Sequence, residues 1–488
     1  MEHGLRRALL ALWLGEDLGL SAEELQTAYY VALLGTVGCT IEAAALAEFF
    51  KDEIAFVEHV VTVDPTRQLS LAAFFLSRVG EGDPPVRRAR KFLTFARAGP
   101  GAIHAVCRDV ALQIGEVLDI GPEIRQGLAQ CHERWDGKGH PMRLRSDQLS
   151  LGARLFHLAH DVEIFNRLGG AEAAVTVARQ RAGKIYDPRI AERFSASASA
   201  YLRRLESEAT WDTLLASEPH PVRMLSADEL DAILVAIADF VDLRSPYTFG
   251  HSRGVATVAE SGARQLGLSD ADTSAVRRAA LVHDIGRVGV PVTLWNKSEK
   301  LTDAEWERMK GHPALTELLF ARSSALGPLG TLAGLHHERL DGTGYRGVPA
   351  SFQPIAAQVL AVADAYRSKL EPRPHRSALT ADEAASAVRQ ESKQGRLDRR
   401  VVDAVLDAAG HASPRDRSRN PADLTDREMD VLRLVVRGLS NREMANALVL
   451  SPKTVGRHVE HIYDKIGVST RVGATLFALQ NGLADSAV

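Results

Sequence analysis

Residues 230–241 read Leu-Asp-Ala-Ile-Leu-Val-Ala-Ile-Ala-Asp-Phe-Val, and their bulkiest apolar side chains recur at intervals of three and four. This spacing places Leu230, Leu234 and Ile237 on one face of a helix, whereas a strand alternates at every second residue. The same period runs through most of the chain, and strand signals are almost absent. The sequence therefore predicts an all-α protein.

Length, charge and cysteine content limit the classes of protein to consider. The chain has 488 residues, 45% of them apolar, so its length suggests roughly three domains of about 150 residues each. Its 59 basic and 62 acidic residues give a net charge of −3, which excludes a globally basic nucleic-acid coat protein. Cys39, Cys107 and Cys131 are too few and too scattered for a disulfide framework or a zinc knuckle, so a reducing compartment is expected.

No targeting or membrane segment is predicted. Residues 8–14 are apolar but too short for a signal-peptide core. The longest uncharged run, residues 25–41, falls short of the roughly 20 apolar residues that a membrane-spanning helix needs, and it is predicted to be a buried helix. We therefore expect a cytoplasmic protein with no membrane partner.

An internal repeat organises the first 410 residues. Residues 131–141 match residues 336–346 at six of eleven positions, and the interval from His3 to Gly38 equals that from His251 to Gly286. Turn-rich stretches near residues 218–221 and 413–421 mark boundaries. The predicted domains are a degenerate first copy at 1–216, a second copy at 217–410, a linker at 411–421 and a C-terminal domain at 422–488.

Seven imidazole and carboxylate side chains are distributed along helical patterns in the second copy. Adjacent residues on a helix diverge by about 100°, so one member of the His283-Asp284 pair can bridge two metal ions while the other binds one. These donors suit Fe, Mn, Zn or Ni better than Mg or Ca, and two such ions can activate a water molecule and clamp a phosphoryl oxygen. Core histidines would explain any one of these residues but not the ordered set, which is His251, His283, Asp284, His312, His336, His337 and Asp364.

The segments 281–286 (Leu-Val-His-Asp-Ile-Gly), 310–313 (Lys-Gly-His-Pro) and 336–345 resemble the HD-GYP phosphodiesterases, over residues 226–410. These helical enzymes hydrolyse the bacterial messenger cyclic di-GMP. The resemblance implies two divalent ions, with Fe or Mn favoured over Mg, and Asp284 as their bridge. It further implies one ion held by His251, His283, Asp284 and Asp364, a second held by Asp284, His312, His336 and His337, catalytic roles for Asp284 and Arg287, and substrate contacts from Tyr345, Arg373 and Arg376.

The second copy departs from the pattern of this family at four positions. Tyr247 stands where some members have the glutamate that binds a third ion, so two ions are expected. Arg287 replaces the usual lysine and keeps its charge. Arg346 stands in place of the proline of the Gly-Tyr-Pro motif, and Arg367 in place of an acid three residues after the last ligand. These changes leave the ligand set intact but put the substrate loop in question.

The first copy lacks that ligand set. By the repeat, His251 corresponds to His3, but His283 and Asp284 fall on Gly35 and Thr36, so no carboxylate can bridge two ions. We predict a regulatory or dimerisation module. A lone ion could still be bound by its remaining donors, but they match no known ligand spacing and ordinary packing is the preferred interpretation for them; they are His104, Cys107, His132, His157 and His160.

The C-terminal residues predict a helix-turn-helix. Thr425-Asp-Arg-Glu428 and Ser440-Asn-Arg-Glu443 are capping boxes, and Ser451-Pro452 supplies an N-cap and an N1 proline for a third helix. The sequence of this region closely resembles the LuxR-type DNA-binding domain. The resemblance implies a fourth helix at about 470–482 that pairs protomers into a homodimer. The basic, polar face of the third helix is predicted to contact double-stranded DNA through Lys453, Thr454, Arg457, His458, His461 and Lys465.

Three functions fit these observations. The first is a transcription regulator whose central site hydrolyses a cyclic dinucleotide or a related phosphoester. The second is a regulator that binds metal and senses a nucleotide without turning it over. The third is a phosphohydrolase that uses the helix-turn-helix for assembly or localisation.

Overall fold

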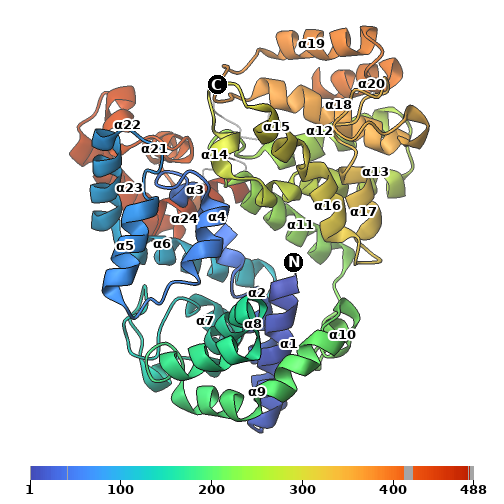
Figure 1. The fold of residues 1–488 in the computed structure, drawn as a ribbon. Helices are drawn as coiled ribbons and strands as arrows, with labels where there is room; N and C mark the ends of the chain where they lie inside the picture. The colour runs from blue at the N-terminus through green and yellow to red at the C-terminus, as the bar shows by residue number, and fades with distance from the viewer. Residues whose placement is uncertain (1, 41, 411–420, 482, 484–488) are drawn as a thin grey trace. The chain divides into compact units, whose positions relative to one another are not determined.

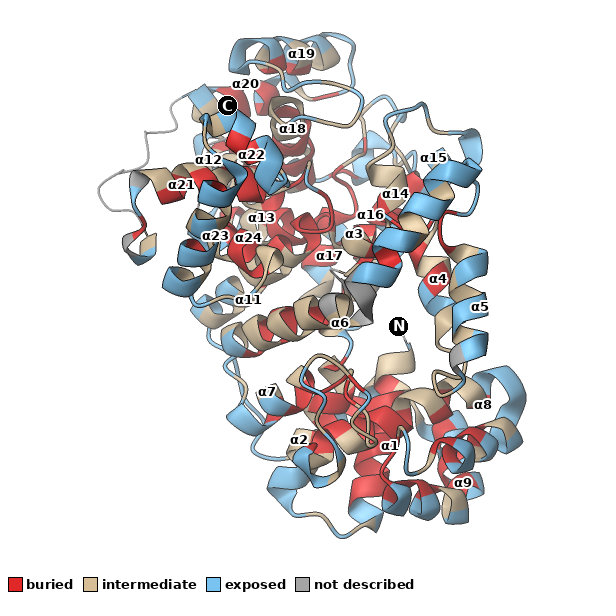
Figure 2. Cartoon of the chain, turned by 90° about the vertical axis from the view of Figure 1, so that its left-hand side faces the viewer, coloured by how far each residue is buried: buried red, intermediate tan, exposed pale blue. Residues whose placement is uncertain are grey.

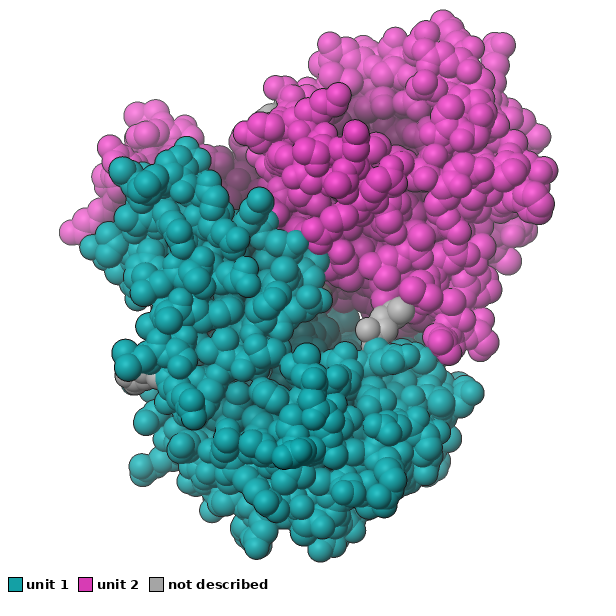
Figure 3. Space-filling model, in the orientation of Figure 1, with its two compact units in different colours: residues 1–226 teal, residues 227–488 magenta. Residues whose placement is uncertain are grey.

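The computed structural model describes residues 2–40, 42–410, 421–481 and 483. Within these residues it contains helices and three isolated bridges but no strand, so the all-α prediction is confirmed. The chain divides into two compact units, Met1–Ser226 and Ala227–Val488 (Figure 3). The predicted boundary at 216/217 lies ten residues earlier, and the predicted linker lies, except for Pro421, outside the described residues; the domain boundaries therefore stay predictions.

The first unit is built around the long helices at its two ends, α1 and α8–α9, whose buried residues form its main core (Figures 1 and 2). Leu9, Leu158 and Phe194 are completely buried there. Its described elements are α1 (Glu2–Asp17), α2 (Ala22–Leu34), η1 (Val37–Thr40), α3 (Glu42–Leu46), α4 (Glu53–Val60), α5 (Gln68–Arg78), α6 (Pro85–Val117), α7 (Pro122–Ala129), η2 (Ser146–Gln148), α8 (Leu151–Arg181), α9 (Pro188–Glu208) and α10 (Trp211–Ala216).

The apolar run near residue 30 folds into a helix shorter than a membrane span. α2 ends at Leu34 and buries Ala28, Tyr29 and Val31 in the first unit. By length and composition alone, the segment Ala22–Leu46 could cross a membrane, a test that the core helix of a globular protein also passes. The prediction of a cytoplasmic protein stays a prediction.

In the second unit, α12 packs against α13, α18 and α20, and α18 runs through the core (Figure 2). Ala259, Val359 and Ala363 are completely buried at these contacts. The described elements before residue 411 are α11 (Ala227–Asp242), α12 (His251–Gln265), α13 (Asp270–Val282), η3 (Ile285–Gly289), α14 (Val292–Trp295), α15 (Asp303–Lys310), α16 (His312–Phe320), α17 (Gly327–Ala333), η4 (Ala350–Phe352), α18 (Ile355–Leu370), α19 (Ala381–Lys393) and α20 (Arg399–Gly410).

The C-terminal domain has the helices that its caps predict. Both capping boxes form, and Gly438 and Gly467 end their helices with φ values of +80° and +70°, a region that glycine enters without strain. Met444, Val455 and Ile462 are buried where the helices meet. The described elements are η5 (Pro421–Asp423), α21 (Asp426–Val436), α22 (Asn441–Leu448), α23 (Pro452–Ile466) and α24 (Arg471–Gln480).

Candidate metal centre

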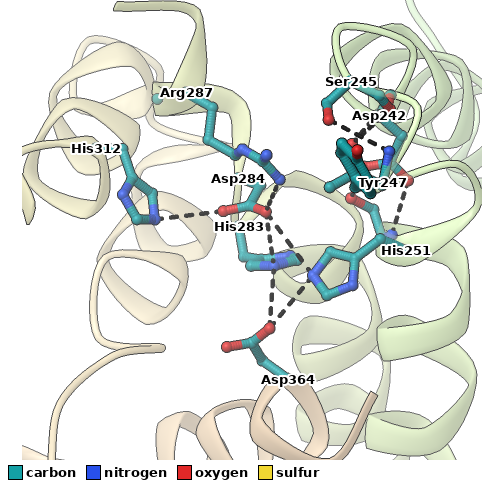
Figure 4. A network of polar contacts seen from close by, with 12 residues as sticks. Asp242, Ser245, Tyr247, His251, His283, Asp284, Arg287, His312 and Asp364 are labelled. Carbon is teal, nitrogen blue, oxygen red and sulfur yellow. Dashed lines mark hydrogen bonds and ion pairs between the residues drawn. The ribbon is translucent and has the colours of Figure 1, made fainter. Parts of the chain in front are cut away.

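Five segments of the second unit bring the seven predicted ligands together. His251 and His312 are the first residues of α12 and α16, and Asp364 lies within α18. His283 and Asp284 occupy the junction of α13 and η3, and the His336-His337 pair follows α17. All are buried except His337, whose side chain is 22% exposed. Figure 4 shows the convergence of most of these side chains.

Asp284 stands between two groups of histidines. Its Oδ1 lies 3.3 Å from His312 Nε2 and 3.6 Å from His336 Nε2. Its Oδ2 lies 3.5 Å from His283 Nε2 and 3.8 Å from His251 Nε2. Each carboxylate oxygen thus faces a different pair of imidazoles, which is the geometry of a carboxylate that bridges two cations.

Asp364 completes the group that contains His251 and His283. Its Oδ1 lies 3.3 Å from His251 Nε2, and its Oδ2 lies 3.5 Å from His337 Nδ1. The ligand atoms of His251, His283 and Asp364 are mutually within 4.8 Å, as are those of His312, His336 and His337. The seven side chains therefore form two adjoining clusters, one on each side of Asp284.

Backbone carbonyls orient three of the rings. The Nδ1 atoms of His283, His312 and His336 each lie 2.6–2.7 Å from the carbonyl oxygen of the residue three positions earlier. An Nδ1–H donated to a carbonyl leaves Nε2 as an unprotonated ligand atom that points to the centre. Each ring therefore presents Nε2 to the cluster because its own helical turn holds the other nitrogen.

Glu371, at the end of α18, is a residue of the site that the sequence reasoning missed. Its Oε2 lies 2.9 Å from Nδ1 of His251. The usual acid of the family, three residues after the last ligand, is here Arg367, and Glu371 lies four residues further along the chain, with its Oε1 3.7 Å from Nη2 of Arg367. The signal was available, since Glu371 follows Asp364 by seven residues, about two helical turns, and so shares its face.

Arg287 anchors the bridging carboxylate. Its Nη1 lies 2.9 Å from Asp284 Oδ2, and its guanidinium stacks over the Trp295 ring at 3.7 Å from the centroid. Both Arg287 and Trp295 line the cavity described below. The guanidinium thus holds Asp284 in place while facing the space beside the cluster.

The electrostatics of the cluster fit bound cations. Burial and neighbouring histidines lower the pKa of His336 well below its usual range, and burial lowers the pKa of His337 to about 3, so both are neutral as metal ligands must be. Burial alone would raise the pKa of Asp284, but His283 and Arg287 hold it well below its ordinary value. Nε2 of His283 is buried without a hydrogen-bond partner in the described residues.

Unlike the pKa values of His336 and His337, the pKa of His251 is raised. Burial lowers the pKa of His251, but Glu371 and Asp364 outweigh it and raise that pKa to about 10. A cation must therefore displace a proton here, and the two carboxylates that hold this proton are the groups that would stabilise the metal-bound imidazole. The donor set as a whole, five imidazoles and two carboxylates, fits divalent transition metals.

A cavity of about 730 Å³ opens onto the cluster. His251, Asp284 and His337 line it, and so do all three predicted substrate contacts. The Tyr345 ring lies 4.3 Å from the His337 ring, centroid to centroid.

The two predicted substrate arginines differ in the protein groups that their side chains contact. Arg373 donates to the carbonyl of Tyr247 and pairs with Glu371 at 3.1 Å. Arg376 donates to several backbone carbonyls, among them that of Glu371, so its guanidinium also supports the loop.

Arg346 takes no part in this cavity. Its Nη1 lies 2.6 Å from Glu317 Oε2. The loop that carries it is held by Glu338, whose carboxylate accepts the backbone N–H groups of Arg346 and Val348. The first copy keeps the same device, with Glu133 accepting from Met142 and Leu144, so this glutamate has a structural role in both copies.

The corresponding place in the first unit is filled by protein atoms. A Cβ at Gly35 would lie 2.4 Å from the Phe156 ring, so this ring occupies the place of the missing His283 side chain. Arg7, completely buried, donates to the carbonyl of Ala32 and to Nδ1 of His160, and its guanidinium stacks on Phe156. A fixed guanidinium therefore stands where the second unit gathers its candidate metal ligands.

Of the first-unit donors considered above, only Cys107 and His132 join a cluster of possible metal ligands in the described residues, although His132, His157 and His160 line one pocket and the His104 ring stacks on His132. Nε2 of His3 lies 2.9 Å from His160, as His251 meets Asp364 in the second unit. His157 faces the carbonyl of Gln130. Cys107 and His132 lie in a cluster considered below.

In the C-terminal domain, the predicted DNA-contacting residues differ in accessibility. Lys453, Thr454, Arg457 and His461 on α23 are exposed, and His458 is half-buried. Lys465 instead pairs with the buried Glu428 of α21 at 2.7 Å. Lys453, Thr454 and Arg457 lie in the first half of α23, the part of a recognition helix that enters the major groove, and His461 lies in its second half.

The fold and the site define an all-helical protein with a buried His/Asp centre suited to divalent cations and a helix-turn-helix at its C-terminal end. Family models agree: residues 236–401 match "HD domain", and residues 422–478 match "Bacterial regulatory proteins, luxR family". The resemblance inferred from sequence is confirmed.

Among curated proteins, the chain is 30% identical to 3'3'-cGAMP-specific phosphodiesterase 3 of Vibrio cholerae over 405 residues, 81% of this chain and 88% of that protein. It is 36% identical to the cyclic di-GMP phosphodiesterase response regulator RpfG of Xanthomonas campestris over 36% of this chain and 46% of that protein. The crystal structure of a cyclic GMP-AMP-specific phosphodiesterase of V. cholerae shares the fold, with a TM-score of 0.58 and 24% identity over 84% of this chain and 93% of that one. The chain belongs to the family of HD-domain phosphodiesterases that includes these relatives.

Proposed function

We propose that the second unit hydrolyses a phosphodiester bond of a cyclic dinucleotide, 3'3'-cGAMP or cyclic di-GMP, and that the C-terminal domain couples this activity to transcription. The observation that carries the proposal is the position of Asp284, which lies between two histidine clusters and lines a cavity of about 730 Å³. Relatives over most of the chain and over the HD domain are phosphodiesterases for these two messengers. A cavity of this size suits a small-molecule substrate.

The site is proposed to bind two divalent ions, Fe or Mn before Mg, because its donors are mainly imidazole. His251, His283, Asp284 and Asp364 would hold one, and Asp284, His312, His336 and His337 the other. When bound, such a pair activates water and neutralises charge on the phosphoryl group that is attacked.

The chain's own residues would supply positioning and charge. Arg287 holds Asp284 and presents its guanidinium to the cavity, where it would stabilise negative charge on the phosphoryl oxygens. Arg373 and Tyr345 line the wall and would orient the second phosphate or a base.

The test of this activity uses purified full-length protein loaded with Mn²⁺ or Fe²⁺ and given each messenger separately. Chromatography should detect a linear dinucleotide, and the product should disappear in Asp284→Ala. Asp270→Ala, which removes an exposed carboxylate from the start of the same helix α13, should keep it. Tight binding without product would replace hydrolysis by sensing; neither binding nor product would overturn the proposal.

We infer further that a homodimer binds two DNA half-sites through α23, in the cytoplasm where the genome lies. The exposed Lys453, Thr454 and Arg457 support this, since the N-terminal part of a recognition helix contacts bases and phosphates. Arg457→Ala should weaken duplex binding and lower the salt-dependence slope by about 1 if its partner is a phosphate. Turnover of the messenger should stay unchanged; light scattering that finds only monomers on DNA would contradict the dimer.

A further inference from the structure

A second cluster of metal-binding side chains lies in the first unit, away from the place that Arg7 fills. It gathers Cys39 of η1, Glu42 of α3, Cys107 of α6 and His132, which follows α7. One ligand atom from each lies within 4.8 Å of all the others. These are two sulfurs, a nitrogen and an oxygen, a donor set that favours Zn²⁺ over Mg²⁺ or Ca²⁺.

The four ligand atoms lie close enough together for one zinc ion to bind them after a small adjustment. Cys39 Sγ lies 3.4 Å from His132 Nε2, and Cys107 Sγ lies 2.6 Å from Glu42 Oε1. With zinc–ligand bonds of about 2.0–2.3 Å, the edges of a tetrahedron measure about 3.3–3.8 Å. Cys39 and His132 already lie at such a distance, Glu42 and Cys107 must separate by about 1 Å, and all four ligand atoms lie within 4.8 Å of one another. Their present contact is a thiol–carboxyl hydrogen bond, and the ion would replace its proton.

The backbone around the cluster is built for close approach. A Cβ at Gly38 would lie 2.2 Å from the carbonyl oxygen of Cys107, so η1 can lie against α6 only with glycine there. In the second unit, a Cβ at Gly286 would lie 1.9 Å from the carbonyl oxygen of His312. Cys107 therefore takes the place of the candidate ligand His312, in a segment too long and too diverged for sequence alignment.

Charge and neighbouring rings favour a bound cation. Two thiolates, one carboxylate and Zn²⁺ sum to −1, and the buried guanidinium of Arg7 compensates: burial lowers its pKa to about 10, while Cys131 and Cys39 act to raise it. The His104 ring stacks on His132 at 4.3 Å with 6° between the planes, which fixes the orientation of the ligand imidazole.

We propose that Cys39, Glu42, Cys107 and His132 bind one structural zinc ion, which ties η1, α3, α6 and the segment after α7 together. The repeat has thus lost its two-ion site from the first copy and gained a different one beside it. This site needs no activity from the second unit.

The test uses the full-length Asp284→Ala protein, which lacks the carboxylate between the second unit's two clusters and needs no turnover, so that failure here is separable from failure of the proposed phosphodiesterase. Elemental analysis of protein prepared with zinc should find about one tightly held ion per chain, as expected for a four-ligand site. Adding Cys107→Ser should remove it. Adding Cys131→Ser, which alters the neighbouring buried cysteine outside the set, should not.

A second measurement avoids variants of the first unit. Cobalt in place of zinc should give the intense charge-transfer absorption of cobalt–thiolate bonds, and chelation should abolish it and expose Cys39 and Cys107 to alkylation. The proposal is overturned if Asp284→Ala holds no zinc, if Cys107→Ser holds as much, or if fresh protein contains a Cys39–Cys107 disulfide.

Discussion

The two copies of the repeat place different chemistry at the same point of one helical framework. In the second unit, Asp284 lies within 4 Å of four imidazole nitrogens, and a cavity opens beside it. In the first unit, Phe156 and the buried Arg7 fill the equivalent space. The framework accommodates both arrangements because buried polar groups have partners in each. In the first copy the Arg7 guanidinium donates hydrogen bonds to buried carbonyl groups, and in the second copy bound cations are proposed to partner the buried imidazoles and carboxylates.

The carboxylate that contacts the first histidine of each copy, His3 or His251, also comes from a different position in the two copies. In the first unit Glu163, three residues after His160, contacts His3 and accepts from Arg6 at 2.8 Å, whereas in the second unit Arg367 stands three residues after Asp364. In the second unit Glu371 contacts His251 instead. A histidine–carboxylate pair thus persists in both copies although its carboxylate comes from different turns of the helix.

The largest effect is expected from moving the guanidinium into the second copy. Val255 on α12 corresponds to Arg7 on α1 and is completely buried. Val255→Arg should pair with Asp364, exclude the metal ions and lower phosphodiesterase activity about a thousandfold, since the ions supply several kcal/mol of stabilisation. Elemental analysis and turnover check this. Val255→Met introduces a side chain of similar length without a charge, and this variant should keep its metal ions. If Val255→Arg also kept its metal ions, Arg7 would not take the place of cations in the first copy.

Removing the guanidinium from the first copy should destabilise that unit and leave phosphodiesterase activity unchanged. Arg7→Met leaves the carbonyls of Ala32 and Leu33 without their buried donor and should cost about 3 kcal/mol. Amide hydrogen exchange in α1 and α2 would measure the loss. Unchanged protection would mean that the guanidinium contributes little, and a fall in turnover would mean that the copies are not chemically separate.

A smaller effect is expected from the carboxylate behind His251. Glu371→Gln removes the charge that orients and polarises this imidazole, and metal affinity of the second unit should fall about 10–100-fold. Chelator competition measures it. Glu163→Gln makes the matched change in the first copy and should leave that affinity as it is; equal losses would show a general folding defect.

The smallest effect concerns pH. Burial opposes the ionisation of Glu163, but His3, Arg167 and Arg6 outweigh it and lower its pKa below the ordinary value of 4.5. The ionised carboxylate therefore stabilises the first unit above about pH 4.5, and this contribution is lost as the pH falls through the lowered pKa. Glu163→Gln should cost about 2 kcal/mol at neutral pH, and wild type and variant should converge in acid. Hydrogen exchange in α1 at several pH values follows this; a constant difference would contradict it.

Local patterns in the sequence were sufficient for the helical class, the repeat and the C-terminal helices. Capping boxes such as Ser440–Glu443 act through neighbouring residues, so they can be predicted without tertiary contacts. Five of the seven candidate ligands sit in short motifs, and His251 and Asp364 were named from the ordered set and the family resemblance; the structure brings all seven together, although their roles stay proposals. Glu371 was missed because its target His251 lies 120 residues away in the chain.

What the sequence determined by itself is therefore the set of elements and the chemistry that each can offer, because period, caps and turn residues are properties of neighbours along the chain. Only the tertiary structure decided which of these side chains come together. Cys107 comes within reach of Cys39 and His132 only because Gly38 lets η1 press against α6, and Arg7 fills its site only because α1 packs on α2 and α8. Such encounters join segments tens of residues apart, and their distances depend on the packing of every helix between them.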